Sequence, residues 1–200
     1  SMDSAAPGVR PELFSESGTT VECLRLVGGG TCDIVLLHEG LGCIELWREF
    51  PQQLARSAKA NVIAYSRAGY GKSDAIKLPR PLDYMGREAI DFLPAFLNRL
   101  ELHRPILLGH SDGATIALEF AAAFPQALSG LVLMAPHVFV EQISIDAIGA
   151  ANAAYARGTL KDKLKRYHGT NVDNAFRGWC DSWLDPAFLA WDIRSKLRDI

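Results

Sequence analysis

The sequence predicts an α/β protein with a mostly parallel sheet wound with helices on both faces, plus a helical insertion. Short apolar runs alternate with longer helical patterns, as in chains that build parallel sheets. The middle runs are apolar at almost every position, as strands covered on both faces require. After Pro136 only helical patterns continue. We therefore predict a core over 1–138, a helical cap insertion over 139–192, and the start of a return to the core over 193–200.

Five segments predict strands, because each is a short, mainly apolar run bounded by turn residues. They are residues 21–27, 32–38, 61–66, 105–110 and 130–136. The three glycines at 28–30 predict a hairpin turn that pairs the first two strands.

Helical spacing of apolar residues fills the segments between the strands. The predicted helices span 43–57, 82–100 and 114–124, and the clearest ones in the insertion span 147–157 and 160–167. Pro94 interrupts the second of them and should kink or divide it, because proline cannot donate the helical hydrogen bond.

The composition excludes several classes of protein. The chain has 200 residues, 48% of them hydrophobic and 22% charged, and a net charge of −2, as in one ordinary globular domain. It has no basic stripe for nucleic acid and no stretch near the roughly 20 apolar residues that span a bilayer. We expect a small-molecule substrate, no nucleic acid or membrane as partner, no cofactor and no metal. Assembly into a homo-oligomer stays open.

The cysteines and the first residues predict the compartment. Cys23, Cys32, Cys43 and Cys180 show no close pair spacing, and three of them lie in or beside apolar segments that suit buried free thiols. Residues 1–18 lack a charged start followed by an apolar core, so no secretory signal is predicted. These features favour a cytoplasmic protein with reduced thiols.

Residues 109–113, Gly-His-Ser-Asp-Gly, fit the pattern G-x-S-x-G between a predicted strand and a predicted helix. That context distinguishes a nucleophile elbow from a chance match. The tight turn needs glycine on both sides, and the helix N-terminus favours developing negative charge. We predict that Ser111 is a nucleophile; the alternative is a serine that only caps the helix.

On these residues the sequence resembles the α/β-hydrolase family, from about residue 26 to residue 136 and more weakly through the insertion. The family also has a loop of the form Asp-x-Arg-Gly-x-Gly-x-Ser, which residues 66–73 match except for Ser66 in place of the acid. That loop is structural in the family. Residues 71–73 also match half of a phosphate-binding loop, but its first glycine and its following helix are missing.

The resemblance implies an oxyanion hole. In the family, a His-Gly loop after an earlier strand supplies half of it, and residues 38–42 match that loop here. The backbone N–H groups of Gly40 and Asp112 would then hold the oxyanion. Because the family has glycine where Glu39 stands, the register could shift and make Leu41 the donor.

The usual acid and base are not recognisable in this chain. The family order is serine, then acid, then histidine, and no strand-like segment follows the insertion. We therefore expect the acid and the base beyond residue 200 and the chain to be a fragment. Alone, it should be nearly inactive and should aggregate through the unpaired edge of its sheet.

Residues inside the chain offer substitutes. His137 follows a predicted strand and could act as the base, although lining the pocket is the simpler role. His168 could reach down from the insertion or pack within it, and Glu141 could act as the acid.

The remaining candidates have plainer roles. His38 should hydrogen-bond its own loop, and His110 should pack beneath the elbow. His103 lies at the wrong end of a strand. Cys43 begins a helix and is either a thiol of low pKa or a small packing residue.

The substrate follows from the nucleophile and the insertion. Haloalkane dehalogenases and epoxide hydrolases of this fold place Asp where Ser111 stands, so an ester, thioester or lactone bond is favoured. Trp179, Trp183 and Trp191 suggest a pocket for an apolar or aromatic acyl group, unless they only pack the insertion onto the core. Glu39 and His137 would also line it, and the carboxylates of Glu39 and Asp112 would disfavour highly anionic substrates.

The sequence thus predicts an ester-type hydrolase that forms an acyl-enzyme at Ser111. Two alternatives stay open: a carbon–carbon bond hydrolase of the same fold, and a non-catalytic ligand-binding module.

Overall fold

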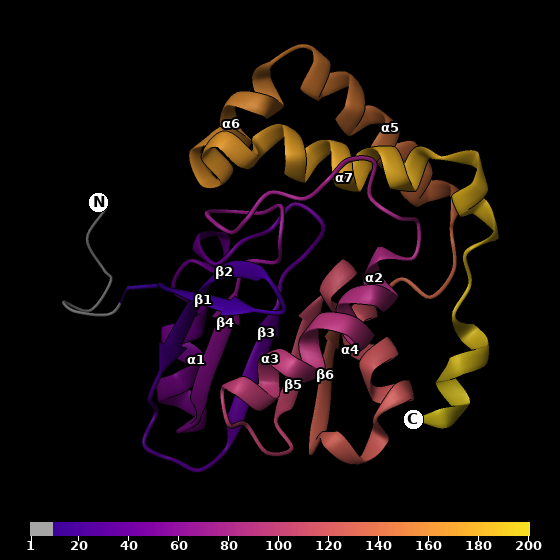
Figure 1. Ribbon diagram of the computed structural model, residues 1–200. Helices are drawn as coiled ribbons and strands as arrows, with labels where there is room; N and C mark the ends of the chain where they lie inside the picture. The colour runs from indigo at the N-terminus through magenta and orange to yellow at the C-terminus, as the bar shows by residue number, and fades with distance from the viewer. Residues whose placement is uncertain (1–9) are drawn as a thin grey trace.

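The computed structural model describes residues 10–200, so the first nine residues of the predicted core lie outside the described residues. Six strands form one sheet in the order β1-β2-β4-β3-β5-β6 (Figure 1). Their bounds are β1 (Glu12–Glu16), β2 (Thr19–Leu26), β3 (Asp33–Leu37), β4 (Asn61–Tyr65), β5 (Ile106–His110) and β6 (Gly130–Met134). Strands β4, β3, β5 and β6 are parallel, whereas β1 and β2 run antiparallel at one edge. The predicted fold class is confirmed.

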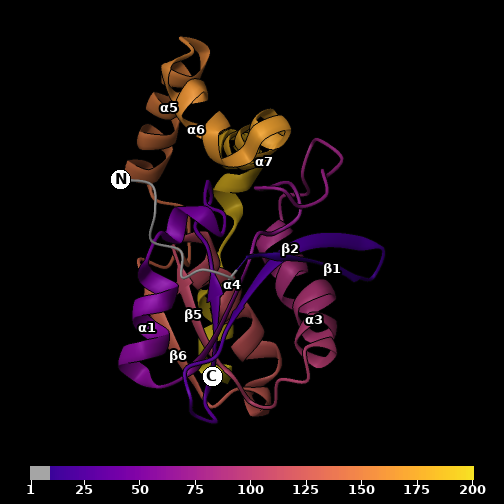
Figure 2. The ribbon, with the colours of Figure 1, turned by 90° about the vertical axis from the view of Figure 1, so that its left-hand side faces the viewer.

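The helices cover both faces of the sheet and its upper end. They are α1 (Phe50–Ala58), α2 (Tyr84–Arg87), α3 (Leu93–Arg99), α4 (Asp112–Ala123), α5 (Gln142–Ala156), α6 (Thr159–His168) and α7 (Val172–Leu184). Helix α1 lies on one face of the sheet and α3 on the other (Figure 2). Helices α5 to α7 stand over the carboxyl ends of the parallel strands. Shorter turns of 3-10 helix span Glu45–Trp47, Pro125–Ala127, Gly169–Asn171, Pro186–Ala190 and Arg194–Asp199.

The five predicted strands are confirmed to within two residues at each end. The predicted hairpin between the first two is wrong, because β4 lies between β2 and β3 and pairs with both. Gly28 and Gly30 instead allow the backbone of a neighbouring segment to approach closely. A Cβ on Gly28 would lie 2.0 Å from the carbonyl oxygen of Ala60, and one on Gly30 would lie 2.1 Å from that of Lys59.

Strand β1 is an edge strand that the hydrophobic pattern does not predict. Its residues are mostly exposed, so they lack the apolar alternation that marks a half-buried strand. It forms a hairpin with β2 through Ser17 and Gly18, both of which have positive φ.

Two of the predicted helices are divided. Residues 43–57 form a 3-10 turn and then α1, separated at Arg48, which has a φ of 55°. In 82–100, a π-helical turn at Glu88–Phe92 joins α2 to α3. Pro94 lies just after this turn, and its ring would clash with the carbonyl four residues earlier, that of Ile90, in a regular α-helix. The wide turn relieves that clash, so the predicted interruption is confirmed.

Two apolar clusters pack the molecule. The larger joins the sheet to α2, α3 and α4 and continues into α5 and α7, and the smaller lies beneath α1. Helical structure fills most of 139–192, and the two ends of this segment meet where the Ile193 N–H donates to the Val138 carbonyl (2.8 Å). Within residues 10–200, no helix has the length and apolar character to cross a membrane.

Candidate active site

Ser111 occupies the turn between β5 and α4 with φ 54° and ψ −116°. A non-glycine residue rarely adopts positive φ, so surrounding contacts must hold it there. The Ser111 N–H donates to the Met134 carbonyl (2.8 Å), and the Ser111 carbonyl accepts from Ala114 and Thr115 (2.9 and 3.1 Å). The Ser111 hydroxyl makes no capping bond to α4, so it is free for another role.

Glycines on both sides allow this turn. A Cβ on Gly109 would lie 2.4 Å from the carbonyl oxygen of Gly113. A Cβ on Gly113 would lie 2.0 Å from the carbonyl oxygen of Leu37, at the end of β3. Neither position has room for any side chain, so the elbow geometry depends on both glycines.

His137, three residues beyond β6, contacts the serine. Its Nε2 lies 3.2 Å from Ser111 Oγ. The His137 N–H donates to Thr115 Oγ1 (3.1 Å), and the Thr115 hydroxyl donates to the His137 carbonyl (2.6 Å). The imidazole also packs edge-on against Trp183, at 4.8 Å between ring centroids. This histidine is therefore fixed within hydrogen-bond distance of the serine.

The loop after β3 is held by His38. Its Nε2 accepts from the Arg67 N–H (3.0 Å), so its proton is on Nδ1, which donates to the Glu39 carbonyl (2.7 Å). Burial, followed by the positive charge of Arg67, lowers the pKa of His38 well below its usual value. The expected loop-bonding role is confirmed.

Arg67 is a site residue that the sequence did not single out. Its guanidinium is buried and donates to the carbonyls of His38 (2.6 Å) and Glu39 (3.1 Å). The Gly42 N–H also donates to the Glu39 carbonyl (3.1 Å), so three donors converge on one oxygen. In a planar trans peptide the N–H points opposite to the C=O, so the Gly40 N–H is turned away from them. The only sequence signal was its place in the 66–73 loop.

Asp112 is buried next to Ser111. The Tyr84 hydroxyl donates to Asp112 Oδ2, and the Trp183 indole N–H donates to the Tyr84 oxygen (3.0 Å). Burial and the nearby Asp112 carboxylate raise the pKa of Tyr84 well above its usual value, so the phenol stays protonated. Within residues 10–200, Asp112 Oδ1 has no hydrogen-bond partner.

The three tryptophans differ in their surroundings. A Cβ on Gly40 would lie 2.3 Å from the indole nitrogen of Trp179, so this ring lies over the loop after β3. Trp183 is buried against His137 and Phe188, and Trp191 stacks on Phe188 (5.3 Å between centroids). Trp179 and Trp183 thus lie beside the serine region, whereas Trp191 packs the end of the helical segment.

The remaining candidates lie as follows. His110 does not pack beneath the elbow: its side chain is 41% exposed and faces Glu39, with 4.0 Å between Nδ1 and Oε2. Burial raises the pKa of Cys43 to about 11, which excludes a low-pKa thiol. Glu141 is exposed at the start of α5, and His103 is exposed in its loop. His168 is buried between two loops.

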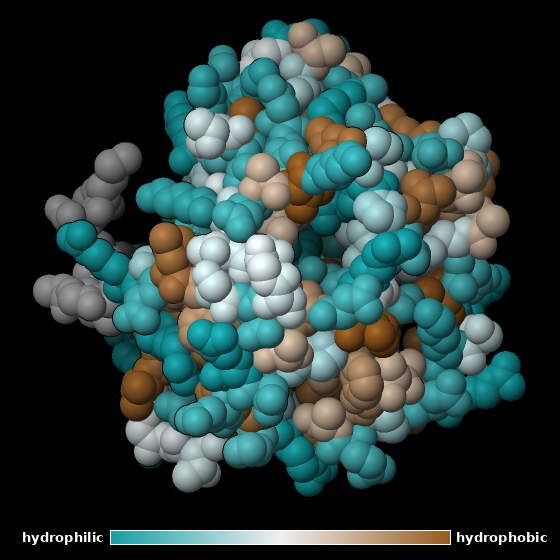
Figure 3. Space-filling view, viewed as in Figure 1, coloured by the Kyte–Doolittle hydropathy of each residue, from teal (hydrophilic) through white to brown (hydrophobic). Residues whose placement is uncertain are grey.

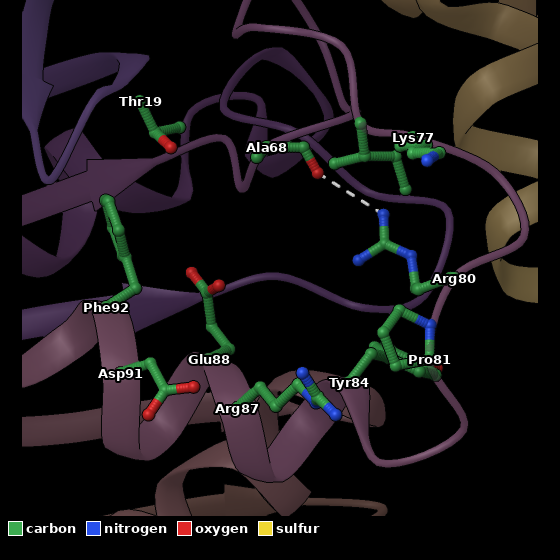
Figure 4. Close-up of a pocket in the computed structure, with 11 residues that line it drawn as sticks. Thr19, Ala68, Lys77, Arg80, Pro81, Tyr84, Arg87, Glu88, Asp91 and Phe92 are labelled. Atoms are coloured by element: carbon green, nitrogen blue, oxygen red, sulfur yellow. Dashed lines mark hydrogen bonds between the residues drawn. The ribbon is translucent and has the colours of Figure 1, made fainter.

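A separate cavity of about 240 Å³ is lined in part by Tyr84. Figure 4 shows Arg80 and Glu88 on opposite walls of it. Arg80 stacks over the Tyr84 ring (5.0 Å), and Glu88 accepts from the Tyr65 hydroxyl (2.8 Å). The space-filling view, from the same side as Figure 1, shows a hollow near the centre of the face turned to the viewer (Figure 3). Ser111 does not line this cavity.

Comparison with known proteins decides the family. Residues 34–198 match the family model described as the alpha/beta hydrolase fold. The chain belongs to the α/β-hydrolase fold family. It is similar to the serine hydrolase BPHL of Homo sapiens, with 27% identity over 161 residues that cover 79% of this chain and 53% of that protein.

Two further proteins are similar to this chain. The 2-hydroxy-6-oxo-2,4-heptadienoate hydrolase of Pseudomonas putida is 33% identical over 114 residues, covering 56% of this chain and 39% of that protein. The dihydrolipoyllysine-residue acetyltransferase component of an acetoin cleaving system from the same species is 28% identical over 159 residues, covering 80% of this chain and 41% of that protein. The chain thus spans about half or less of the length of these relatives.

Solved structures share the fold. A carboxylesterase structure from Nitrososphaera gargenis superposes with a TM-score of 0.70 at 19% identity, covering 94% of this chain and 76% of that one. An esterase from Exiguobacterium antarcticum superposes with a TM-score of 0.68 at 21% identity, covering 92% and 74%.

Proposed function

We propose that this chain carries the nucleophile of an ester-type hydrolase and that Ser111 forms the acyl-enzyme. The observation that carries the proposal is the 3.2 Å contact between Ser111 Oγ, on its strained turn, and His137 Nε2. A serine hydroxyl is a weak nucleophile unless a base lies within hydrogen-bond reach. His137 would fill that role here, in place of the pocket-lining role that its sequence position favoured. With His137 as the base, the near-inactivity expected of a chain without one would not apply.

The chemistry follows the usual two steps. Ser111 Oγ attacks the acyl carbonyl while His137 Nε2 accepts the hydroxyl proton, and that proton then passes to the leaving group. Water next attacks the acyl-enzyme and gives a proton to His137 Nε2. His137 passes that proton to Ser111 Oγ as the acyl C–Oγ bond breaks, which releases the acid product and restores the free serine. Within residues 10–200, no hydrogen bond joins the His137 ring to a carboxylate, so these residues offer a dyad.

The proposed oxyanion hole comprises the N–H groups of Gly40 and Asp112. The Gly40 donor is supported by the three donors on the Glu39 carbonyl, which turn the Gly40 N–H the other way. The Asp112 donor belongs to the first residue of α4, where N–H groups have no partner within the helix. Leu41 remains the alternative donor if the loop register is shifted.

We propose a small substrate with an apolar or aromatic acyl group. Trp179 and Trp183 supply apolar surface beside the serine region, and the buried Asp112 carboxylate disfavours an anionic acyl group there. Carbon–carbon bond cleavage is the second candidate, because a relative with 33% identity is a 2-hydroxy-6-oxo-2,4-heptadienoate hydrolase. Turnover of that compound without turnover of aryl esters would select the second candidate.

Fluorophosphonate labelling with peptide mapping tests the nucleophile and the base separately. We expect label on Ser111 in the wild-type protein, none in Ser111→Ala, and labelling slowed by roughly 10³-fold or more in His137→Ala. His110→Ala is the matched control, because His110 adjoins Ser111 in sequence but its side chain faces Glu39. Labelling that survives Ser111→Ala overturns the nucleophile, and labelling unaffected by His137→Ala overturns only the base. A protein that binds aryl esters without labelling or turnover is a binding module.

A further inference from the structure

His168, the last residue of α6, links two loops at the upper end of the sheet. Its Nδ1 accepts from the Gly71 N–H (2.9 Å), and its Nε2 lies 2.9 Å from the Leu41 carbonyl oxygen. A neutral imidazole that accepts at Nδ1 carries its proton on Nε2, so Nε2 donates to Leu41. The ring is buried, and burial lowers the pKa of His168, in keeping with the neutral form.

Leu41 belongs to the turn at 39–42 that carries the proposed Gly40 donor. At the start of this turn the Glu39 carbonyl accepts from the side chains of His38 and Arg67, in addition to the Gly42 N–H of the turn itself. At its other end, the Leu41 carbonyl accepts from His168, and the same peptide directs the Gly42 N–H back to the Glu39 carbonyl. Gly40 and Gly42 lack the side chains that would restrict such a turn, so contacts from outside must fix it.

We propose that His168 is a positioning residue of the oxyanion loop, which it holds by donating from Nε2 to the Leu41 carbonyl. The inference rests on the proposed function, since it concerns the same site. The packing of α6 over the sheet would then also fix the direction of the Gly40 N–H. Helix α6 is then part of the catalytic apparatus although none of its side chains touches the reacting atoms.

A neighbouring residue provides a matched control. The Asn171 side-chain amide donates to the carbonyls of Gly71 (3.1 Å) and Ser73 (2.7 Å). It therefore attaches the same part of the helical segment to the same loop as His168 does, but without a bond to 39–42. Removing it loosens the attachment and leaves the Leu41 carbonyl with its donor.

Two substitutions distinguish the roles of the two imidazole nitrogens. In His168→Gln the amide nitrogen reaches the place of Nε2 and keeps the donor to Leu41, whereas His168→Asn keeps only an acceptor for Gly71. We expect His168→Asn to lower kcat on an aryl ester about tenfold or more, with KM within about threefold. This approaches the roughly 10²–10³-fold loss that follows deletion of an oxyanion donor. His168→Gln and Asn171→Ala should keep kcat within about threefold of wild type.

The affinity for a trifluoromethyl ketone, which forms an oxyanion on the serine, should fall in parallel with kcat in His168→Asn. Equal losses of kcat in His168→Asn and Asn171→Ala would overturn the inference, because His168 would then only hold the helices on the core. Wild-type kcat in His168→Asn would overturn it as well. A wild-type protein without Ser111-dependent turnover is a different result, since it removes the proposed function itself.

Folding of the variants is followed by thermal unfolding. If His168→Asn does not fold, amide hydrogen exchange of residues 39–42 in Asn171→Ala decides instead. Slow exchange, as in the wild-type protein, supports the inference, and fast exchange overturns it because the attachment of the helices as a whole would then order the turn.

Discussion

Single side chains at this site act mainly by fixing backbone groups. Arg67 and His38 hold one carbonyl of the 39–42 turn, and His168 holds another. Thr115 fixes the main chain of His137 in the same way. Most buried polar groups are hydrogen-bonded, and here those hydrogen bonds set the direction of the amides around Ser111. The chemistry of the site therefore depends on residues that need not touch a substrate.

His38 gives a pH dependence of stability. Its pKa in the folded state is lowered by burial and by Arg67, whereas in the unfolded chain it should be near 6.5. Below pH 6.5 the unfolded state therefore binds more protons, and the free energy of unfolding falls as the pH falls. The slope is at most about 1.4 kcal/mol per pH unit for one such histidine. Burial also lowers the pKa of His168, so it contributes in the same direction.

Urea unfolding between pH 7 and pH 5 checks this expectation. His38→Gln should show a flatter decline of the free energy of unfolding than wild type, whatever its stability at pH 7. His103→Gln, at an exposed loop position, should keep the wild-type slope. Parallel slopes for wild type and His38→Gln would show that His38 does not titrate differently on folding.

At the scale of the elements, the elbow was predictable because each of its parts has a local signal. A continuous apolar run marks β5, an apolar helical pattern marks α4, and the glycines at 109 and 113 mark the tight turn. The glycines at 28–30 have the same kind of local pattern, but the hairpin that they predict is wrong. A glycine needed for close approach to Ala60 looks the same in sequence as one needed for a turn.

Gly113 should be the most sensitive position of the elbow. A Cβ there would overlap the Leu37 carbonyl oxygen at 2.0 Å, and this contact is backbone that cannot move away without distorting β3. We expect Gly113→Ala to lower the free energy of unfolding by about 3 kcal/mol or more, as overpacking of a tight core does. Urea unfolding measures the loss.

Gly149 provides the control for that substitution. It lies inside α5, and among residues 10–200 no heavy atom apart from its chain neighbours and the adjacent helix backbone lies within 4 Å of where its Cβ would be. Gly149→Ala should therefore stabilise the protein by about 0.5–1 kcal/mol, because alanine loses less backbone entropy in a helix. If Gly113→Ala were tolerated as well as Gly149→Ala, α4 would not approach β3 as closely as this contact implies.

The whole molecule brings together contacts that no local pattern contains. Ser111 was predictable from its motif, but the partners of His137, Arg67 and His168 come from segments far apart in sequence. His168 and Leu41 are separated by 127 positions, and Ser111 and His137 by 26. A single sequence shows which of these residues could do chemistry. Which ones meet is shown only by the pairing of the strands and by the packing of α5 to α7 over the sheet.

The packing also leaves one strand partly uncovered. Leu131 and Leu133 of β6 pack on the larger core cluster, but Val132 and Met134 on the opposite face are 45% and 37% exposed. Helix α1 and its cluster cover that face beneath β2, β4, β3 and β5, and do not reach β6. Within the described residues, β6 pairs only with β5, so its outer edge is open too.

An open apolar edge of this kind predicts self-association of the 200-residue chain. Because charged side chains on an edge strand oppose pairing with another chain, Val132→Lys should shift the sedimentation profile at a fixed concentration toward the monomer. Ile143→Lys is the matched control, since Ile143 is an apolar residue that is 75% exposed but lies on helix α5 and not on a strand. It should leave the profile unchanged. If Ile143→Lys dissolved the assemblies and Val132→Lys did not, the association would involve the helical segment, and the edge of β6 would play no part in it.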